Sequence, residues 1–212
     1  MKRCYLCGAT ENITRDHIPP EGFFIPPLPD NLITVPCCYS CNDSYKKDDE
    51  AARTFFSAYR WQSAKGMWVW KNKVVNSTFK RSPKLKANIR KSLLHVPVQT
   101  DQGVEIMPAI LFPEDRLNRW LIRITRGLLF KFYPDIDSSD MYFEVDQITP
   151  SQELADTMYA TMTYDERGNG IFRFWRAVVS DEINCPGMWS YVFYDGMCFS
   201  VAHSKDKSDF TI

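Results

Sequence analysis

Two short cysteine pairs lie in the N-terminal quarter of the chain. Two residues separate Cys4 from Cys7, two separate Cys38 from Cys41, and 30 residues lie between the pairs. A tight turn with this spacing can point two thiolates at one ion, and two such turns supply the four sulfur ligands of a structural zinc site. The spacing therefore predicts bound Zn²⁺, against the alternative of four buried cysteines that pack as small apolar residues.

A fifth cysteine leaves the identity of one zinc ligand undecided. Cys37 directly precedes Cys38, and its distance from Cys41 along the chain also permits a zinc knuckle. We prefer Cys38, because its pair with Cys41 repeats the spacing of the first pair. A bound metal would also stabilise the first 50 residues, which contain few core residues, since metal binding contributes roughly 10–16 kcal/mol in small zinc modules.

Residues suited to hydrolysis lie between and just after the cysteine pairs: Asp16 and His17, then Asn31, then Asn42. Phosphodiester hydrolysis needs an activated water and a metal ion that neutralises developing charge. The imidazole of His17 accepts a proton near neutral pH, which suits a general base. The carboxylate of Asp16 is a good ligand for Mg²⁺ or Mn²⁺. Neighbours on a strand point to opposite faces, so we expect a bend or bulge that brings both to one site.

The order Cys-x2-Cys, Asp-His, Asn, Cys-x2-Cys-Asn over residues 4–50 resembles the zinc-stabilised branch of the HNH endonuclease family. The resemblance implies a ββα-metal module in which His17 is the general base and Asn31 orients its imidazole. It also implies that Asp16 and Asn42 hold a catalytic Mg²⁺ or Mn²⁺. The expected activity is hydrolysis of phosphodiester bonds, in double-stranded DNA by family resemblance, within restriction, phage defence or a mobile element.

Each of these residues also has a purely structural interpretation. An Asp-His pair is often a surface turn, Asn31 after Asp30 is equally typical of a turn, and Asn42 suits a helix N-cap. Two rival functions follow. One is a catalytically inactive zinc-binding protein that binds nucleic acid, and the other is a regulatory or scaffolding protein in which the zinc is only a structural staple.

The elements that must position these residues are two short strands and a helix. Extended segments are expected at 12–17 and 32–35, because the dense prolines up to residue 36 prevent a helix there. A helix is expected over 40–61, since it begins with residues of N-cap type and continues with apolar residues at helical spacing.

Two groups of cations are candidate contacts for phosphates. The segment 65–91 holds nine Lys and Arg residues and no Asp or Glu. On a helix expected over 114–132, four arginines form a stripe separate from the apolar face. Such cations bind nucleic acid through counterion release, although a solvated helix face with ion pairs is the alternative. The predicted contacts are Lys80, Arg81, Lys84, Lys86, Arg116, Arg119, Arg123 and Arg126.

The remaining sequence predicts an antiparallel sheet with one or two packed helices, so the fold class is α+β. We expect an HNH module over 1–60 and an α+β domain over 61–212. The expected strands are 104–111, 141–145, 170–179, 188–194 and 197–202, and the expected third helix is 152–162.

Composition sets broad limits. The chain has 212 residues, of which 44% are hydrophobic and 14% aromatic, so it can form a packed core. Its 26 basic and 26 acidic residues argue against a polycation of the histone kind. No apolar run approaches the ~20 residues of a membrane helix, and no signal-peptide pattern is present. We therefore expect a cytoplasmic protein with reduced cysteines and no membrane partner.

Overall fold

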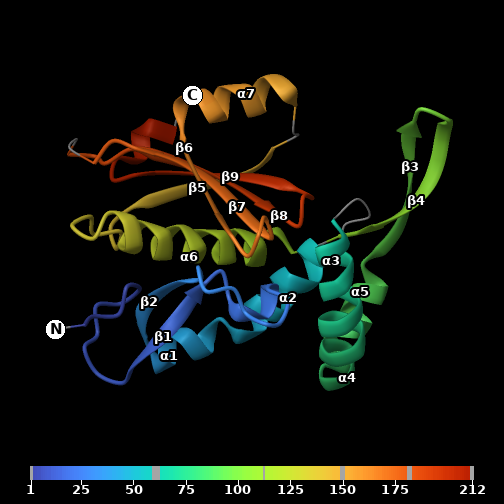
Figure 1. Cartoon of the computed structure of the whole chain (residues 1–212), viewed down its shortest axis with the longest axis horizontal. Helices are drawn as coiled ribbons and strands as arrows, with labels where there is room; N and C mark the ends of the chain where they lie inside the picture. The colour runs from blue at the N-terminus through green and yellow to red at the C-terminus, as the bar shows by residue number, and fades with distance from the viewer. Residues whose placement is uncertain (1, 59–62, 112, 149–150, 181–182, 211–212) are drawn as a thin grey trace.

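The computed structural model describes residues 2–58, 63–111, 113–148, 151–180 and 183–210. These residues form a mixed α+β fold with antiparallel sheets (Figure 1). Two of the sheets are hairpins, and the third has five strands in the order β5-β9-β8-β7-β6. The hairpins are β1 (Ile13–Ile18) with β2 (Ile33–Cys38), and β3 (Leu93–Thr100) with β4 (Gly103–Ile110). The five strands are β5 (Tyr142–Ile148), β6 (Thr163–Arg167), β7 (Phe172–Val178), β8 (Gly187–Phe193) and β9 (Cys198–Ser204).

The N-terminal hairpin is followed at once by helix. Helix α1 (Tyr39–Ser44) begins at the residue after β2, and α2 (Lys46–Ser57) follows it. The single helix expected over 40–61 is therefore interrupted at Tyr45, whose amide bonds back to the carbonyl of Asn42 in a tighter turn. The expected end of that helix falls within residues 59–62, which lie outside the described residues.

Helix α6 (Glu114–Phe132) has the predicted bounds and lies between the N-terminal hairpin and the five-stranded sheet (Figure 1). Its apolar stripe is buried, because the hairpin covers one side and the sheet the other. The contact with the hairpin is close at Gly127. A Cβ atom there would lie 2.7 Å from the side chain of Ile18, so only glycine allows this approach.

One apolar core joins the two regions. The ring of Phe23 stacks on Trp120 with centroids 5.1 Å apart, and the ring of Phe56 lies 4.3 Å from that of Phe193. The hydroxyl of Tyr194 donates to the carbonyl of Phe23 at 2.8 Å. The core is therefore continuous across the predicted boundary at residues 60 and 61, which itself lies outside the described residues.

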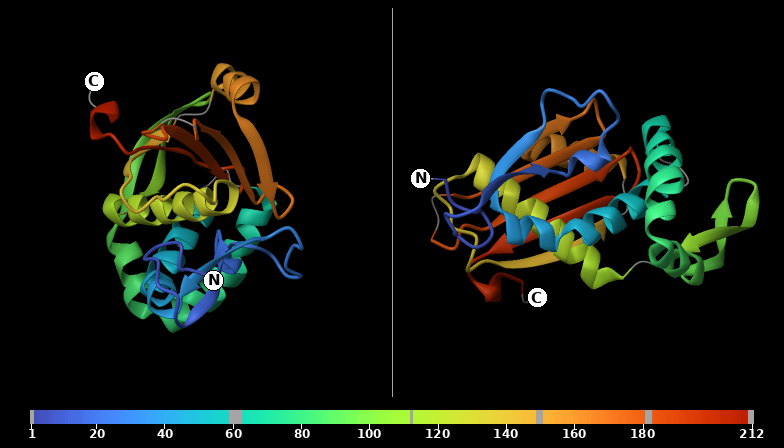
Figure 2. Two further views of the ribbon diagram at one scale, coloured as in Figure 1. Left: turned by 90° about the vertical axis from the view of Figure 1, so that its left-hand side faces the viewer. Right: turned by 90° about the horizontal axis from the view of Figure 1, so that it is seen from below.

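Several elements are absent from the sequence prediction. The sequence patterns do not predict strands β3 and β6 or the short helices that the basic segment forms. The β3–β4 hairpin extends away from the rest of the chain (Figure 2). The helices of the basic segment are α3 (Ala64–Val69), the π-helix η2 (Trp70–Thr78), α4 (Phe79–Arg81) and α5 (Pro83–Lys91). Helix α7 (Gln152–Thr161) matches the expected third helix and covers the sheet face opposite α6 (Figure 1).

Candidate metal centre and the residues around it

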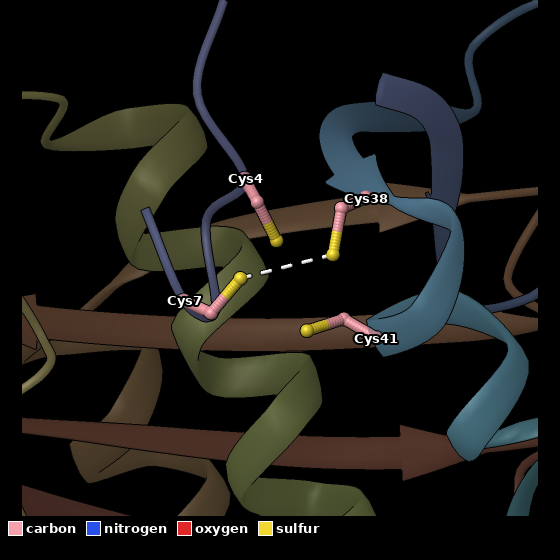
Figure 3. A group of neighbouring side chains, drawn as sticks. All are labelled: Cys4, Cys7, Cys38 and Cys41. Carbon is pink, nitrogen blue, oxygen red and sulfur yellow. Dashed lines mark hydrogen bonds between the residues drawn. The ribbon is translucent and has the colours of Figure 1, made fainter. Parts of the chain in front are cut away.

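Four cysteine side chains gather at the junction of β2 and α1. The sulfur atoms of Cys4, Cys7, Cys38 and Cys41 all lie within 4.8 Å of one another (Figure 3). The Cys7 and Cys38 sulfurs are 3.7 Å apart. Four sulfurs bound to one tetrahedral zinc ion at the usual bond length lie roughly 3.8 Å from each other. These four residues therefore fit a structural metal ion such as zinc.

Local structure explains why the sulfurs converge. Cys38 is the N-cap residue of α1 and Cys41 lies in its first turn, so both side chains project from one end of the helix. The first pair sits in a turn closed by two hydrogen bonds, from the Cys4 amide to Ala9 at 2.8 Å and from the Gly8 amide to Cys4 at 2.9 Å. Gly8 has a φ of +75°, which favours glycine. A hydrogen bond with Ser40 lowers the pKa of Cys38 to about 6, and this favours the thiolate that a metal requires.

Cys37 is not part of this group. It pairs with Thr14 across the hairpin, and its side chain is fully buried on the face opposite that of Cys38. Its sulfur lies 3.9 Å from that of Cys4, and burial raises the pKa of its thiol. The fifth cysteine is therefore a core residue beside the metal centre.

Asp16 lies in a second centre, where it pairs with an arginine from α6. The Nη2 of Arg123 lies 2.7 Å from one oxygen of Asp16 and 2.8 Å from the other. The Tyr5 hydroxyl donates to Oδ2 of Asp16 at 2.8 Å. Asp16 is 4% exposed and the Arg123 side chain is fully buried. Both oxygens of the carboxylate are thus engaged by protein groups.

The same guanidinium serves a second carboxylate. Its Nη1 lies 2.5 Å from Oδ1 of Asp49, which also accepts a hydrogen bond from the indole of Trp120 at 2.9 Å. The ring of Tyr45 covers the guanidinium, with the centroid 4.7 Å away. Desolvation raises the pKa of Asp49, while the Arg123 charge opposes that shift. The guanidinium of Arg123 is therefore the cation that lies between Asp16 and Asp49.

His17 lies on the other face of β1. The six residues of β1 pair with β2 without interruption, with Asp16 opposite Val35 and His17 opposite Thr34. The expected bend or bulge is thus absent from the strand, and the two side chains diverge. His17 Nε2 lies 3.2 Å from Glu21 Oε1, and the imidazole side chain is 26% exposed. Lys73 reaches the same turn, with its Nζ 3.4 Å from the carbonyl of Glu21.

The two asparagines serve different parts of the fold. Asn42 donates to the hydroxyl of Thr14 at 3.3 Å, which holds α1 against the Asp16 face of β1. Asn31 accepts from the Gly168 amide and donates to the Glu166 carbonyl, both at 3.3 Å. It ties the β1–β2 loop to the turn between β6 and β7, and none of its bonds that the structure describes goes to His17.

The implied Mg²⁺ or Mn²⁺ does not fit this arrangement. The oxygens of Asp16 are bound by Arg123 and Tyr5, and His17 points away from Asp16. Within the described ranges, the four cysteines form the one group of three or more His, Cys, Asp and Glu side chains placed to hold a metal. We therefore derive no chemical step through a second ion.

The two groups of cations have different surroundings. In the α6 stripe, Arg116 lies 3.3 Å from Asp48, Arg119 also pairs with Asp48, and Arg126 covers the ring of Phe143 at 5.2 Å. Since Arg123 is also buried among its partners, all four arginines of the stripe contact groups of the protein itself. By contrast, the cations of α4 and α5 are exposed, and one ion pair of theirs is described, between Arg81 and Glu50 at 3.6 Å. The exposed set is Lys80, Arg81, Lys84, Lys86, Arg90 and Lys91.

The sequence analysis assigns no role to Tyr5 or Asp49, and it places Lys73 only within the basic segment 65–91. Tyr5 lies between Cys4 and Cys7. Its aromatic character is the one signal in the local sequence that it belongs to the core, where the structure buries it. The contact between Asp49 and Arg123 joins residues 74 apart in the chain, so no spacing rule could have found it.

Comparison with known proteins adds no assignment, since no family model, curated protein or solved structure matches this chain. Among the described residues, no helix combines the length and apolar character needed to cross a membrane.

Proposed function

We propose that this chain is a nucleic-acid-binding protein of the HNH type that a structural zinc ion stabilises. In this proposal the carboxylate of Asp16 is not available as a ligand for a divalent ion. The observation that carries the binding proposal is the surface formed by α4 and α5, which is exposed and basic and whose own residues include no Asp or Glu. The observation that argues against hydrolysis through Asp16 is the pairing of both its oxygens with Arg123 and Tyr5.

The free-energy cost of displacing Arg123 supports the proposal that Asp16 does not bind a divalent ion. A divalent ion at Asp16 would have to displace the guanidinium of Arg123 and leave that charge buried with only Asp49 for compensation. Breaking a buried ion pair by removing one partner costs roughly 3–5 kcal/mol. Binding of the ion must exceed this cost before Asp16 becomes a ligand.

The basic surface is suited to the phosphate backbone rather than to bases. Lys80, Arg81, Lys84 and Lys86 extend from two consecutive short helices, and their long side chains carry no sequence code of their own. Each phosphate that they neutralise makes the slope of log K against log salt more negative by about 0.9 on duplex DNA. Four contacts predict that a doubling of salt weakens binding roughly 12-fold.

A direct test measures anisotropy of a labelled duplex with the zinc-loaded chain at several salt concentrations. We expect the triple variant Lys80→Gln, Lys84→Gln, Lys86→Gln to lower the magnitude of the salt slope by about 2.7. The matched control removes three exposed lysines elsewhere, Lys47, Lys131 and Lys207, by the same change. Equal slopes for wild type and the α4–α5 variant would reject this surface as the interface.

The second candidate is the metal-dependent endonuclease itself, and one observation favours it. His17 is partly exposed and faces the carboxylate of Glu21, so its imidazole is placed to accept a proton from water. Its turn adjoins Lys73, the residue through which the basic segment contacts the loop of β1. In this case Asp16 must leave Arg123 when nucleic acid and metal bind.

A plasmid-nicking assay separates the two candidates. Wild type is compared, with Mg²⁺ or Mn²⁺ and with chelator, against His17→Ala of equal zinc content. Cutting that needs the divalent ion and His17 would establish the endonuclease and reject the first candidate. Salt-dependent binding without cutting would support the first candidate.

A further inference from the structure

The β3–β4 hairpin forms an arm that projects from the rest of the described chain (Figures 1 and 2). Its two strands contact chiefly each other. The base of the arm adjoins the end of α5, because the Leu111 amide donates to the carbonyl of Ser92 at 3.0 Å. A two-stranded hairpin alone is marginally stable in water, so this arm would gain stability from a surface that covers it.

One face of the arm is exposed and largely apolar. Residues opposite each other in the register share a face, as do alternate residues along a strand. Leu93, Val104 and Ile106 therefore lie on the same face. Val104 is 65% exposed, Ile106 is 66% exposed and Leu93 is 43% exposed. The polar residues of this face include His95 and Gln99. An apolar face of this kind marks a place where another surface can dock.

Charge divides sharply between the arm and the helix that precedes it. Residues 65–91 contain no Asp or Glu, whereas residues 92–115 contain four carboxylates and no Lys or Arg. Asp101 is exposed in the turn at the tip of the arm, and Arg90 and Lys91 are exposed at the end of α5, beside the base. Eight strand residues separate tip from base by about 27 Å, so one arm cannot bring its own opposite charges together.

We propose that this arm docks on the same arm of a second copy of the chain, in a dimer with two-fold symmetry. With the arms antiparallel, their apolar faces meet, and Ile106, which pairs with Pro97 near the middle of the hairpin, lies at the symmetry axis. The tip of each arm then reaches the base of the other, where Asp101 of one copy meets Arg90 and Lys91 of the other.

Charge complementarity selects a second copy as the partner. A two-fold interface must be complementary to itself, and an arm that is acidic at one end and basic at the other meets this condition when two arms lie antiparallel. The acidic tip disfavours a phosphate backbone as the partner of the arm. The contact does not use Lys80, Arg81, Lys84 or Lys86, so it goes beyond the proposed nucleic-acid surface and does not depend on it.

Sedimentation velocity of the zinc-loaded full chain, without nucleic acid, tests the proposal. We expect wild type to convert from monomer to dimer as its concentration rises. Ile106→Glu places two carboxylates at the symmetry axis and should weaken dimerisation about a hundredfold or more, because like charges in an interface repel each other. The matched control is Leu28→Glu, at an exposed leucine of the β1–β2 loop, which should dimerise as wild type does.

Charge reversal identifies the partner. Asp101→Arg, and separately the double variant Arg90→Glu, Lys91→Glu, should each weaken dimerisation about tenfold or more, since each change acts twice in a symmetric interface. A mixture of these two variants should regain the affinity of wild type, because both charge contacts of the mixed dimer then join opposite signs. This recovery also shows that both variants are folded. Asp30→Arg, at an exposed carboxylate of the β1–β2 loop, is the control and should leave dimerisation unchanged.

A chain that stays monomeric at every concentration would overturn the proposal, and so would a mixture of the two charge variants that fails to form dimers. A monomeric wild type whose binding to a DNA duplex is weakened by Ile106→Glu would assign the arm to nucleic acid instead. Dimers that Ile106→Glu and the charge variants leave intact would place the interface elsewhere on the molecule.

Discussion

The tetracysteine group and the Asp16–Arg123 centre both lie against the N-terminal hairpin, yet they differ in where their parts come from. The first gathers two cysteine pairs, each within four residues of sequence, in positions where they could hold a metal ion that is not part of the chain. The second gathers Asp16, Asp49 and Tyr5 around a guanidinium from α6. An external cation leaves a spacing pattern in the sequence, whereas an internal cation leaves none.

Removal of the metal is expected to have the largest effect. Cys38→Ser should lose bound zinc and unfold the N-terminal region, because metal binding contributes roughly 10–16 kcal/mol in comparable modules. Zinc content and thermal unfolding measure this. Cys37→Ala is the matched neighbour and should retain one zinc ion, since its sulfur lies outside the group of four. Unfolding that is insensitive to a strong chelator would contradict a structural zinc.

Loss of the internal cation should rank second. Arg123→Met leaves the buried carboxylate of Asp16 and the part-buried carboxylate of Asp49 without their cation, and should lower the free energy of unfolding by roughly 3–5 kcal/mol. Arg116→Met removes a partly exposed partner of Asp48 and should cost under about 1 kcal/mol. Urea unfolding of both variants provides the comparison. Similar losses in the two would mean that the Asp16 centre is no more than a surface ion pair.

The sheet contains a buried ionisable group with no such compensation. His203 is 1% exposed and packs against Phe143, with ring centroids 6.1 Å apart. Burial lowers its pKa to about 4. The folded state therefore favours the neutral ring, so stability is full above the unfolded pKa of about 6.5 and falls as pH drops towards 4.

The size of this pH effect follows from the shift, and amounts to about 3 kcal/mol between pH 6.5 and 4. Unfolding measured across this range in wild type and in His203→Leu should show a steeper acid loss in wild type. His95→Leu is the control, because His95 is exposed on β3. Parallel pH profiles for wild type and His203→Leu would reject the assignment.

The contact between the hairpin loop and the sheet should have the smallest effect. Asn31→Ala removes two hydrogen bonds to the β6–β7 turn and should cost about 1–3 kcal/mol. Its NMR spectrum should change at Gly168 and leave the ring signals of His17 in place. Movement of the His17 signals instead would restore the role that the family resemblance implies for Asn31.

Local chemistry could be predicted because it depends on neighbours in the chain. The group of four cysteines follows from a two-residue spacing, α6 from its apolar period and its acidic first turn, and the turn between β8 and β9 from an Asp-Gly pair. The strands β1 and β2 follow from the proline-rich sequence around them. Strand β3 and the helices of the basic segment escaped prediction, since many of their residues are exposed and each of these helices is short.

The sequence alone determined which residues can bind metal, accept protons or carry charge, because these are properties of side chains and their spacing. The tertiary structure alone decided which of them meet. It placed Arg123 on Asp16, turned His17 to the other face of β1, engaged the α6 arginines and left the α4–α5 cations exposed. The physical reason is that a buried charge costs free energy unless it has a compensating partner. The ion-pair partner of a buried charge can lie far away in the chain, 107 residues in the case of Arg123 and Asp16.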